Sequence, residues 1–138
     1  MKKYSRRINF KDKRGYILDI SYKEDFNHSA LISSNKNSVR ANHYHKKTTQ
    51  ITFILNGSCF YFSKKLNQNK TTKVKLKKYD YLITKPNEIH AYKFLEKTEM
   101  LVLSKGLRGG KDYESDTYRF SPTLINSNKN NENYKIKK

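Results

Sequence analysis

The chain has 138 residues, of which 30 are lysine or arginine and 12 are aspartate or glutamate, so its formal net charge is +18. This length suffices for one domain with a packed core and is short for two. No segment approaches the ~20 consecutive apolar residues of a membrane span. The basic residues 1–7 run into no apolar stretch of the kind that a signal peptide needs. We therefore expect a single cytoplasmic domain with no membrane contact.

The positive charge by itself would suggest a protein that binds nucleic acid. Its distribution argues against that function, because the lysines are spread along the whole chain among many asparagines. A compositional bias produces such a pattern, and no nucleic-acid-binding module is recognisable. We expect no nucleic-acid partner, although a basic surface still attracts anionic small molecules.

Short segments rich in β-branched and aromatic residues alternate with turn residues, a pattern typical of a β-sandwich or β-barrel. The expected strands are residues 16–20, 29–33, 39–44, 50–55, 58–63, 73–76, 81–84, 90–94 and 100–104. Asn56-Gly57 predicts a tight hairpin turn, because both residue types tolerate positive φ. The last two strands are expected to pair with each other.

Composition also predicts the domain boundaries. We expect an N-terminal arm over residues 1–11, a β-barrel over residues 12–120 and a polar, disordered tail over residues 121–138, whose end holds too few apolar side chains to order itself. The single cysteine, Cys59, cannot form an internal disulfide and lies in an apolar run, so we expect a buried thiol.

Three of the four histidines have a spacing with physical meaning. His43 and His45 point to the same side of an extended strand, because alternate residues share a face. His90 begins a later strand and can converge with them inside a barrel, where Gln50 can add an oxygen contact. Neutral imidazoles are common ligands of divalent metals and also serve as acids and bases. The alternative is that these histidines are only hydrogen-bonded surface residues.

Two segments resemble the motifs of the cupin family. Residues 40–57 resemble the first motif, in which His-x-His is followed by an acidic or amide residue and then a glycine, and residues 79–91 resemble the second. The resemblance covers about residues 12–104. It implies an all-β fold, namely a single-domain cupin (jelly-roll) β-barrel.

Within the cupins, the chain resembles small enzymes that act on nucleotide-linked keto-sugars: the sugar 3,4-ketoisomerases, the 3,5-epimerases and the cupin domain of capsular polysaccharide reductases. Residues 12–15 resemble their Asp-x-Arg-Gly, residues 40–46 their Arg-Gly-x-His-x-His-Lys, and residues 112–120 their closing aromatic and acidic segment. The chain departs from the pattern at Ala41 and Asn87, which occupy positions where glycine is usual.

Gln50 is a further departure, because metal-binding cupins commonly carry glutamate at this position. The resemblance to ketoisomerases, which also carry glutamine there, implies catalysis without a metal or another cofactor. In that case His43, His45 and Tyr44 are the catalytic residues. In the alternative metallocupin, His43, His45, Gln50 and His90 bind a divalent metal such as Zn, Fe, Ni or Mn.

The resemblance implies an enzyme of surface polysaccharide biosynthesis, an isomerase or epimerase. A histidine with a pKa near 6.5 suits removal and return of a proton beside a carbonyl. We expect Arg40, Tyr81 and Tyr92 to bind an anionic substrate, a dTDP- or UDP-sugar. Related small cupins commonly pair, so we also expect a homodimer. The open alternative is a metal-binding cupin that acts as a small-molecule binding module or a dioxygenase.

Overall fold

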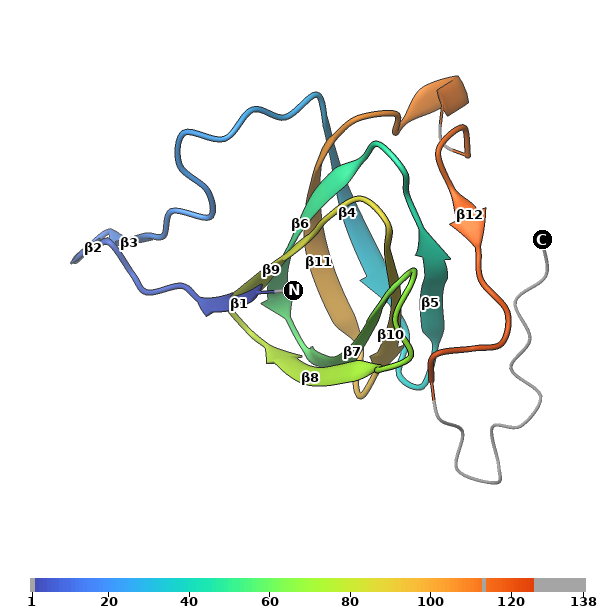
Figure 1. Cartoon of the computed structure of the whole chain (residues 1–138). Coiled ribbons are helices and arrows are strands. Elements are labelled where there is room, and N and C mark those ends of the chain that lie inside the picture. The colour runs from blue at the N-terminus through green and yellow to red at the C-terminus, as the bar shows by residue number, and fades with distance from the viewer. Residues whose placement is uncertain (1, 113, 126–138) are drawn as a thin grey trace.

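The computed structural model describes residues 2–112 and 114–125. Apart from one short 3-10 helix, η1 (Gly110–Asp112), its regular elements are all strands (Figure 1). The strands are β1 (Lys2–Ser5), β2 (Phe10–Asp12), β3 (Gly15–Ile17), β4 (His28–Ser34), β5 (Val39–Tyr44), β6 (Thr49–Asn56), β7 (Ser58–Lys65), β8 (Thr72–Lys77), β9 (Asp80–Thr84), β10 (Glu88–Phe94), β11 (Thr98–Lys105) and β12 (Tyr118–Arg119). The expected all-β class is therefore confirmed.

Two five-stranded antiparallel sheets face each other around the core. One has the strand order β1-β9-β6-β11-β4 and the other β12-β5-β10-β7-β8. A two-stranded hairpin, β2-β3, stands away from both sheets (Figure 1). The two sheets remain separate, so the expected barrel is an open sandwich of two layers.

Consecutive strands from β4 to β7 alternate between the two sheets, and this overturns two predicted pairings. Gly57 alone separates β6 from β7, yet these strands lie in different sheets, so the predicted hairpin is wrong and the chain turns a corner there. A β-carbon on Gly57 would lie 2.5 Å from the carbonyl oxygen of Lys97. The pairing expected for the last two strands is wrong for the same reason, since β10 and β11 also belong to opposite sheets.

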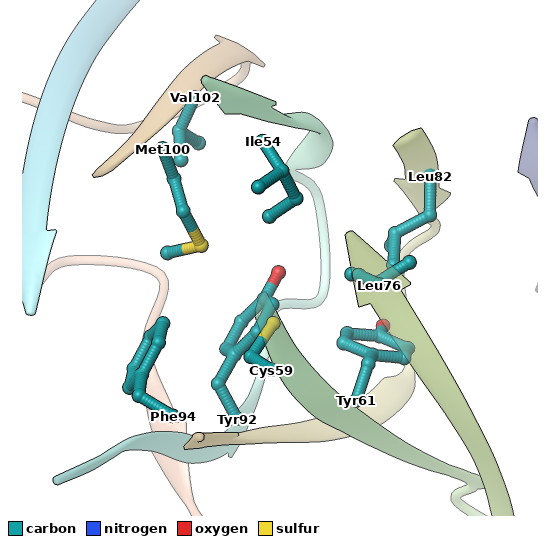
Figure 2. Close-up of a cluster of buried hydrophobic side chains, with 9 residues drawn as sticks. All are labelled: Ile54, Cys59, Tyr61, Leu76, Leu82, Tyr92, Phe94, Met100 and Val102. Atoms are coloured by element: carbon teal, nitrogen blue, oxygen red, sulfur yellow. The ribbon is translucent and has the colours of Figure 1, made fainter. Parts of the chain in front are cut away.

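The side chains between the two sheets form an apolar cluster (Figure 2). Its buried members are Ile54, Cys59, Tyr61, Leu76, Leu82, Tyr92, Phe94, Met100 and Val102. Cys59 is a free, buried thiol as expected, and burial raises its pKa to about 12. This cluster fills the sandwich below the histidines and fixes the strands that carry them.

Both sheets also bury apolar residues on their outer faces. Ile51 and Phe53 of β6 lie in an outer cluster that is partly covered by residues 18–26 of the N-terminal half. On the other sheet, Leu124 and Ile125 cover the outer face of β7 and β10. Each sheet thus buries apolar side chains on both faces, and for this reason the sequences of the central strands are nearly continuous apolar runs.

Two expected domain boundaries need correction. Residues 2–5 of the predicted arm form β1, which pairs with β9 and belongs to the sandwich. The predicted tail begins at residue 121, but Leu124 and Ile125 are buried, because the outer face of the sheet offers them an apolar surface. The remaining tail, residues 126–138, lies outside the described residues. No helix within the described part is long and apolar enough to cross a membrane.

Candidate active site

The structure brings three predicted histidines together at one end of the sandwich. His43 lies near the end of β5 and is paired in register with His90 of β10, while His45 follows β5 directly. The ring centroids of His43 lie 4.8 Å from His45 and 4.7 Å from His90, and those of His45 and His90 are 5.4 Å apart. His45 and His90 are each 1% exposed, so the alternative that these histidines are only hydrogen-bonded surface residues is wrong.

A β-bulge precedes His43. The register between β10 and β5 shifts so that Ala91 pairs with Ala41, which leaves Asn42 as the extra residue. Ala41 and Asn42 have φ values of +66° and +57°. The Asn42 side chain donates to the Phe120 carbonyl (2.7 Å) and accepts from the Leu124 N–H (2.9 Å). These bonds hold the bulge, and bulges commonly re-aim side chains at functional sites.

Hydrogen bonds determine the tautomers of two of the histidines. The Nδ1 atom of His45 lies 2.8 Å from the Asp116 carbonyl oxygen, and that of His90 lies 3.0 Å from the Glu88 carbonyl oxygen. A carbonyl only accepts, so Nδ1 carries the hydrogen in both rings and Nε2 carries a lone pair. The Nε2 atom of His45 is buried with no partner at hydrogen-bonding geometry among the described residues. It is available to a bound molecule.

The surroundings keep all three imidazoles neutral. Burial lowers the pKa of His90 to about 3, with a further contribution from the neighbouring His45. Burial and the charges of the other two histidines hold the pKa of His43 far below its usual range. Burial also lowers the pKa of His45. At neutral pH the cluster therefore presents lone pairs, which accept protons or bind metals.

Two arginines that the sequence analysis did not single out add positive charge around the cluster. The charges of Arg108 and Arg119 both disfavour protonation of His43. Arg119 is paired with Glu114 at 3.3 Å, whereas Arg108 donates to Thr117 at 3.3 Å. Arg108 lies in no motif that marks a site, whereas Arg119 falls within residues 112–120, the segment that resembles the closing segment of the family. The resulting positive potential favours an anionic ligand or intermediate.

Asp116 is a further residue that the sequence analysis did not assign to the site. Its buried carboxylate accepts hydrogen bonds from the backbone N–H groups of Lys46 (3.0 Å) and Lys47 (2.9 Å) and from the Thr48 hydroxyl (2.8 Å). Burial opposes its ionisation, but these bonds outweigh burial and lower its pKa. The backbone carbonyl of Asp116 also accepts a hydrogen bond from His45 Nδ1. Asp116 therefore holds both the loop after β5 and the imidazole of His45. The resemblance of residues 112–120 to a family segment was the one available signal.

Comparison with solved structures bears on this arrangement, whereas no protein-family model and no curated protein matches the sequence. A dTDP-4-dehydrorhamnose 3,5-epimerase from Sulfolobus tokodaii gives a TM-score of 0.72 at 19% identity, over 86% of this chain and 76% of that chain. A double mutant of the QdtA 3,4-ketoisomerase from Thermoanaerobacterium thermosaccharolyticum, in complex with TDP, gives 0.69 at 25% identity over 86% of both chains. A 3,4-ketoisomerase from Helicobacter canadensis gives 0.73 at 18% identity, over 86% of this chain and 90% of that chain.

The chain has the cupin fold. The resemblance drawn from the two sequence motifs is thereby confirmed, since the similar structures are cupin-like enzymes of nucleotide sugars. The histidine cluster lies where β5 and β10 pair, on strands that belong to the two motifs.

The residues of this site also fit a divalent metal. The ligating atoms of His43, His45 and His90 all lie within 4.8 Å of one another. Gln50 lies beside His45 and donates to Ser104 at 3.3 Å, so its amide oxygen can supply a fourth contact. A metal held there would act as a Lewis acid that polarises a carbonyl.

The predicted Tyr92 also reaches the cluster. Its ring centroid lies 6.3 Å from that of His90, and its hydroxyl is hydrogen-bonded to Thr52 at 2.9 Å. It is buried in the core directly below the histidines.

The other three predicted residues lie elsewhere. Tyr44 stacks on Tyr118 with centroids 5.3 Å apart and belongs to the outer apolar cluster, because it alternates with the inward-facing histidines. Tyr81 lies in the outer cluster of the opposite sheet and stacks on Tyr4. Arg40 is exposed and donates to the Ser34 hydroxyl at 2.7 Å. The sequence shows that successive side chains of a strand point to opposite faces, but it does not show which face points into the sandwich.

Proposed function

We propose that this cupin is an isomerase or epimerase of a nucleotide-linked keto-deoxysugar, a dTDP- or UDP-sugar, in which His43 and His45 move a proton beside the carbonyl. The observation that carries the proposal is a pair of neutral imidazoles 4.8 Å apart, one buried and one partly buried, in a positively charged setting. Solved structures of the same fold include a 3,4-ketoisomerase in complex with TDP and a 3,5-epimerase, which supports this substrate class.

The chemistry needs a base, an anion-stabilising charge and an acid. The Nε2 lone pair of His45 removes a proton from the carbon next to the carbonyl, and the electron pair of that C–H bond moves into an enediolate. The imidazolium formed on His45, together with the charge of Arg108, stabilises the enediolate oxygen. His43 relays the hydroxyl proton of the first carbon to the enediolate oxygen, and the imidazolium of His45 then returns its proton to the former carbonyl carbon. The carbonyl re-forms on the first carbon, and both histidines are neutral again.

In this proposal the hydrogen bond from His45 Nδ1 to Asp116 has a defined role. It keeps the reactive lone pair on Nε2 and stabilises the imidazolium while the enediolate exists. Tyr92 packs against the ring of His90, the third member of the cluster. No cofactor is required for this sequence of steps.

The test uses the full chain with dTDP-4-keto-6-deoxyglucose in D₂O, followed by NMR. We expect deuterium to appear on the carbon adjacent to the carbonyl, together with an isomerised or epimerised product. His45→Asn should slow exchange by about 10²- to 10⁴-fold. His28→Gln, which changes the one histidine outside the cluster, is the control. Undiminished exchange in a His43→Ala/His45→Ala double variant would refute the assignment.

The alternative function is a metal-binding cupin that acts as a small-molecule binding module or a dioxygenase. Three imidazoles whose ligating atoms lie within 4.8 Å of one another are the observation behind it. Elemental analysis of the purified protein and of His90→Ala tests it. Stoichiometric metal that is lost in the variant supports the alternative, whereas a folded, metal-free protein that turns over the sugar supports the isomerase.

We also propose that the protein is a homodimer in the cytoplasm and that its reaction is a step of surface polysaccharide biosynthesis. Support for the dimer comes from apolar residues that remain exposed on the β2-β3 hairpin, such as Phe10 (51%) and Ile17 (58%). Leu31, on edge strand β4, is 61% exposed. Exposed apolar groups of this size are typical of protein interfaces.

A further inference from the structure

A hollow of about 720 Å³ opens between the loop that joins β7 to β8 and the turn that joins β9 to β10. The two connections are tied together at its base, where the Leu66 N–H donates to the Asn87 carbonyl at 3.3 Å. These connections lie at the same end of the sandwich as the histidines, because β7 and β9 end there and β10 begins there.

The hollow carries strong positive charge. Its lining includes four lysines, Lys64, Lys65, Lys70 and Lys85, and a single carboxylate, Glu88. That carboxylate is turned towards the core, where it accepts from the Tyr61 hydroxyl (3.2 Å), and it is 7% exposed. It also accepts from the backbone N–H of Lys85 at 3.2 Å.

The lysine charges have no counter-ion in the described part of the chain. The ion pairs found there involve none of the four. Lys64 lies over the ring of Phe120 at 5.0 Å, which leaves Lys65, Lys70 and Lys85 facing the hollow without a partner for their charge. Three ammonium groups around one concave surface favour a ligand with several negative charges.

The hollow adjoins the histidine cluster. Asn87, which lines it, donates its backbone N–H to the His45 carbonyl at 2.6 Å. Ser63, which also lines it, is the register partner of His90 on the neighbouring strand. A molecule that occupies both places must carry its negative charges next to the group on which the histidines act.

We infer that this hollow binds the diphosphate of the nucleotide-linked substrate, with Lys65, Lys70 and Lys85 as counter-ions. The inference rests on the proposed function. In a sugar nucleotide the diphosphate is bonded to the sugar ring, so a diphosphate in the hollow places the sugar next to the histidines. Arg40, which the sequence analysis expects to bind the anionic substrate, donates instead to the Ser34 hydroxyl and to the Ser33 carbonyl on β4.

A second lysine-rich hollow provides a matched control. It measures about 640 Å³ and lies around the corner between β6 and β7, at the other end of the sandwich. Its lining includes Lys75, Lys77 and Lys78. Neutralising three lysines there changes the net charge of the protein by the same amount.

The experiment measures binding of dTDP, and separately of inorganic pyrophosphate, by titration calorimetry on the full chain. The test variant is Lys65→Gln/Lys70→Gln/Lys85→Gln, and the control variant is Lys75→Gln/Lys77→Gln/Lys78→Gln. Thermal melts check that both variants fold. We expect the affinity of the test variant for dTDP to fall about tenfold or more and to lose part of its salt dependence, while that of the control stays within about twofold of wild type.

Each outcome decides between the two proposals. Equal binding by both variants, or equal weakening in both, overturns the diphosphate site and leaves the isomerase proposal intact. Pyrophosphate binding that depends on the hollow, in a protein that does not turn over the keto-sugar, supports the anion site and overturns the isomerase. A wild-type chain that binds neither probe overturns the inference.

Discussion

Ala41 adopts a φ of +66°, a conformation that is unfavourable for a residue with a β-carbon by about 1–2 kcal/mol. The residue lies beside the bulge that precedes His43 and packs against the core between the sheets. Asn87 has a φ of +62° in the turn next to the lysine hollow. Both are positions where the family pattern carries glycine, and the reason is the backbone conformation.

A substitution series at Ala41 tests whether its positive φ strains the backbone. Ala41→Gly should raise the free energy of unfolding by about 0.5 kcal/mol, because relief of strain exceeds the added freedom of the unfolded chain. Ala41→Val should lower it by more than about 1 kcal/mol, because a branched β-carbon tolerates positive φ least. Urea unfolding measures both. Equal stability of the three proteins would contradict the strained backbone.

The buried histidines predict a dependence of stability on pH. The pKa of His90 is about 3 in the folded protein, below the value near 6.5 of an unfolded chain. As the pH falls below 6.5, this histidine binds a proton in the unfolded chain but stays neutral in the folded protein. The free energy of unfolding therefore decreases as the pH falls towards 3. At pH 5 the loss from His90 is about 2 kcal/mol.

Urea unfolding at pH 7 and pH 5, with a chelator present, measures this loss. His90→Gln should show a smaller difference between the two pH values than wild type, because glutamine does not titrate. An unchanged difference in the variant would mean that His90 is not the group that responds.

The C-terminal segment decides how the first motif is held. β12 pairs with the edge of β5, where Arg119 lies opposite His43. Asp116, just before β12, takes three hydrogen bonds from residues 46–48. A segment far along the chain therefore shapes the loop after His45, and local sequence patterns do not reveal such a contact.

Removing the Asp116 carboxylate should destabilise the protein. Asp116→Ala leaves the Thr48 hydroxyl and two backbone N–H groups without their acceptor, which costs about 2–3 kcal/mol. Asp112→Ala, which removes an exposed acid from the same segment, should change stability by less than about 0.5 kcal/mol. Thermal and urea unfolding measure both variants. Similar stability of the two variants would contradict the anchoring role of Asp116.

The β2-β3 hairpin is an apolar region that the described part of the chain leaves uncovered. The β2-β3 hairpin stands off the sandwich (Figure 1) and exposes Phe10 and Ile17, while Tyr16 on the same hairpin is hydrogen-bonded to Tyr79 of the sandwich. The hairpin is thus held in place with its apolar side chains facing outwards. A second copy of the chain is the partner that we propose for it.

Sedimentation equilibrium tests this proposal. We expect a mass of about twice the 16.4 kDa of one chain. Phe10→Asp/Ile17→Asp should yield the monomer, because burying two carboxylates in an apolar interface is unfavourable. Leu66→Asp, at an exposed apolar residue away from the hairpin, should leave the dimer intact. A wild-type monomer at micromolar concentration would contradict the homodimer.

The sequence by itself determined the all-β class, the position of the main strands and the three histidines that meet, because alternation, turn residues and motif spacing are local properties. Tertiary structure decided which strands pair, so Asn56-Gly57 became a corner between sheets. It also decided which face of each strand looks inward, and this placed Tyr44 and Tyr81 outside the cluster. Arg108, Asp116 and the lysine hollow depend on contacts between distant segments, and the energies of such contacts leave no periodic signal in the sequence.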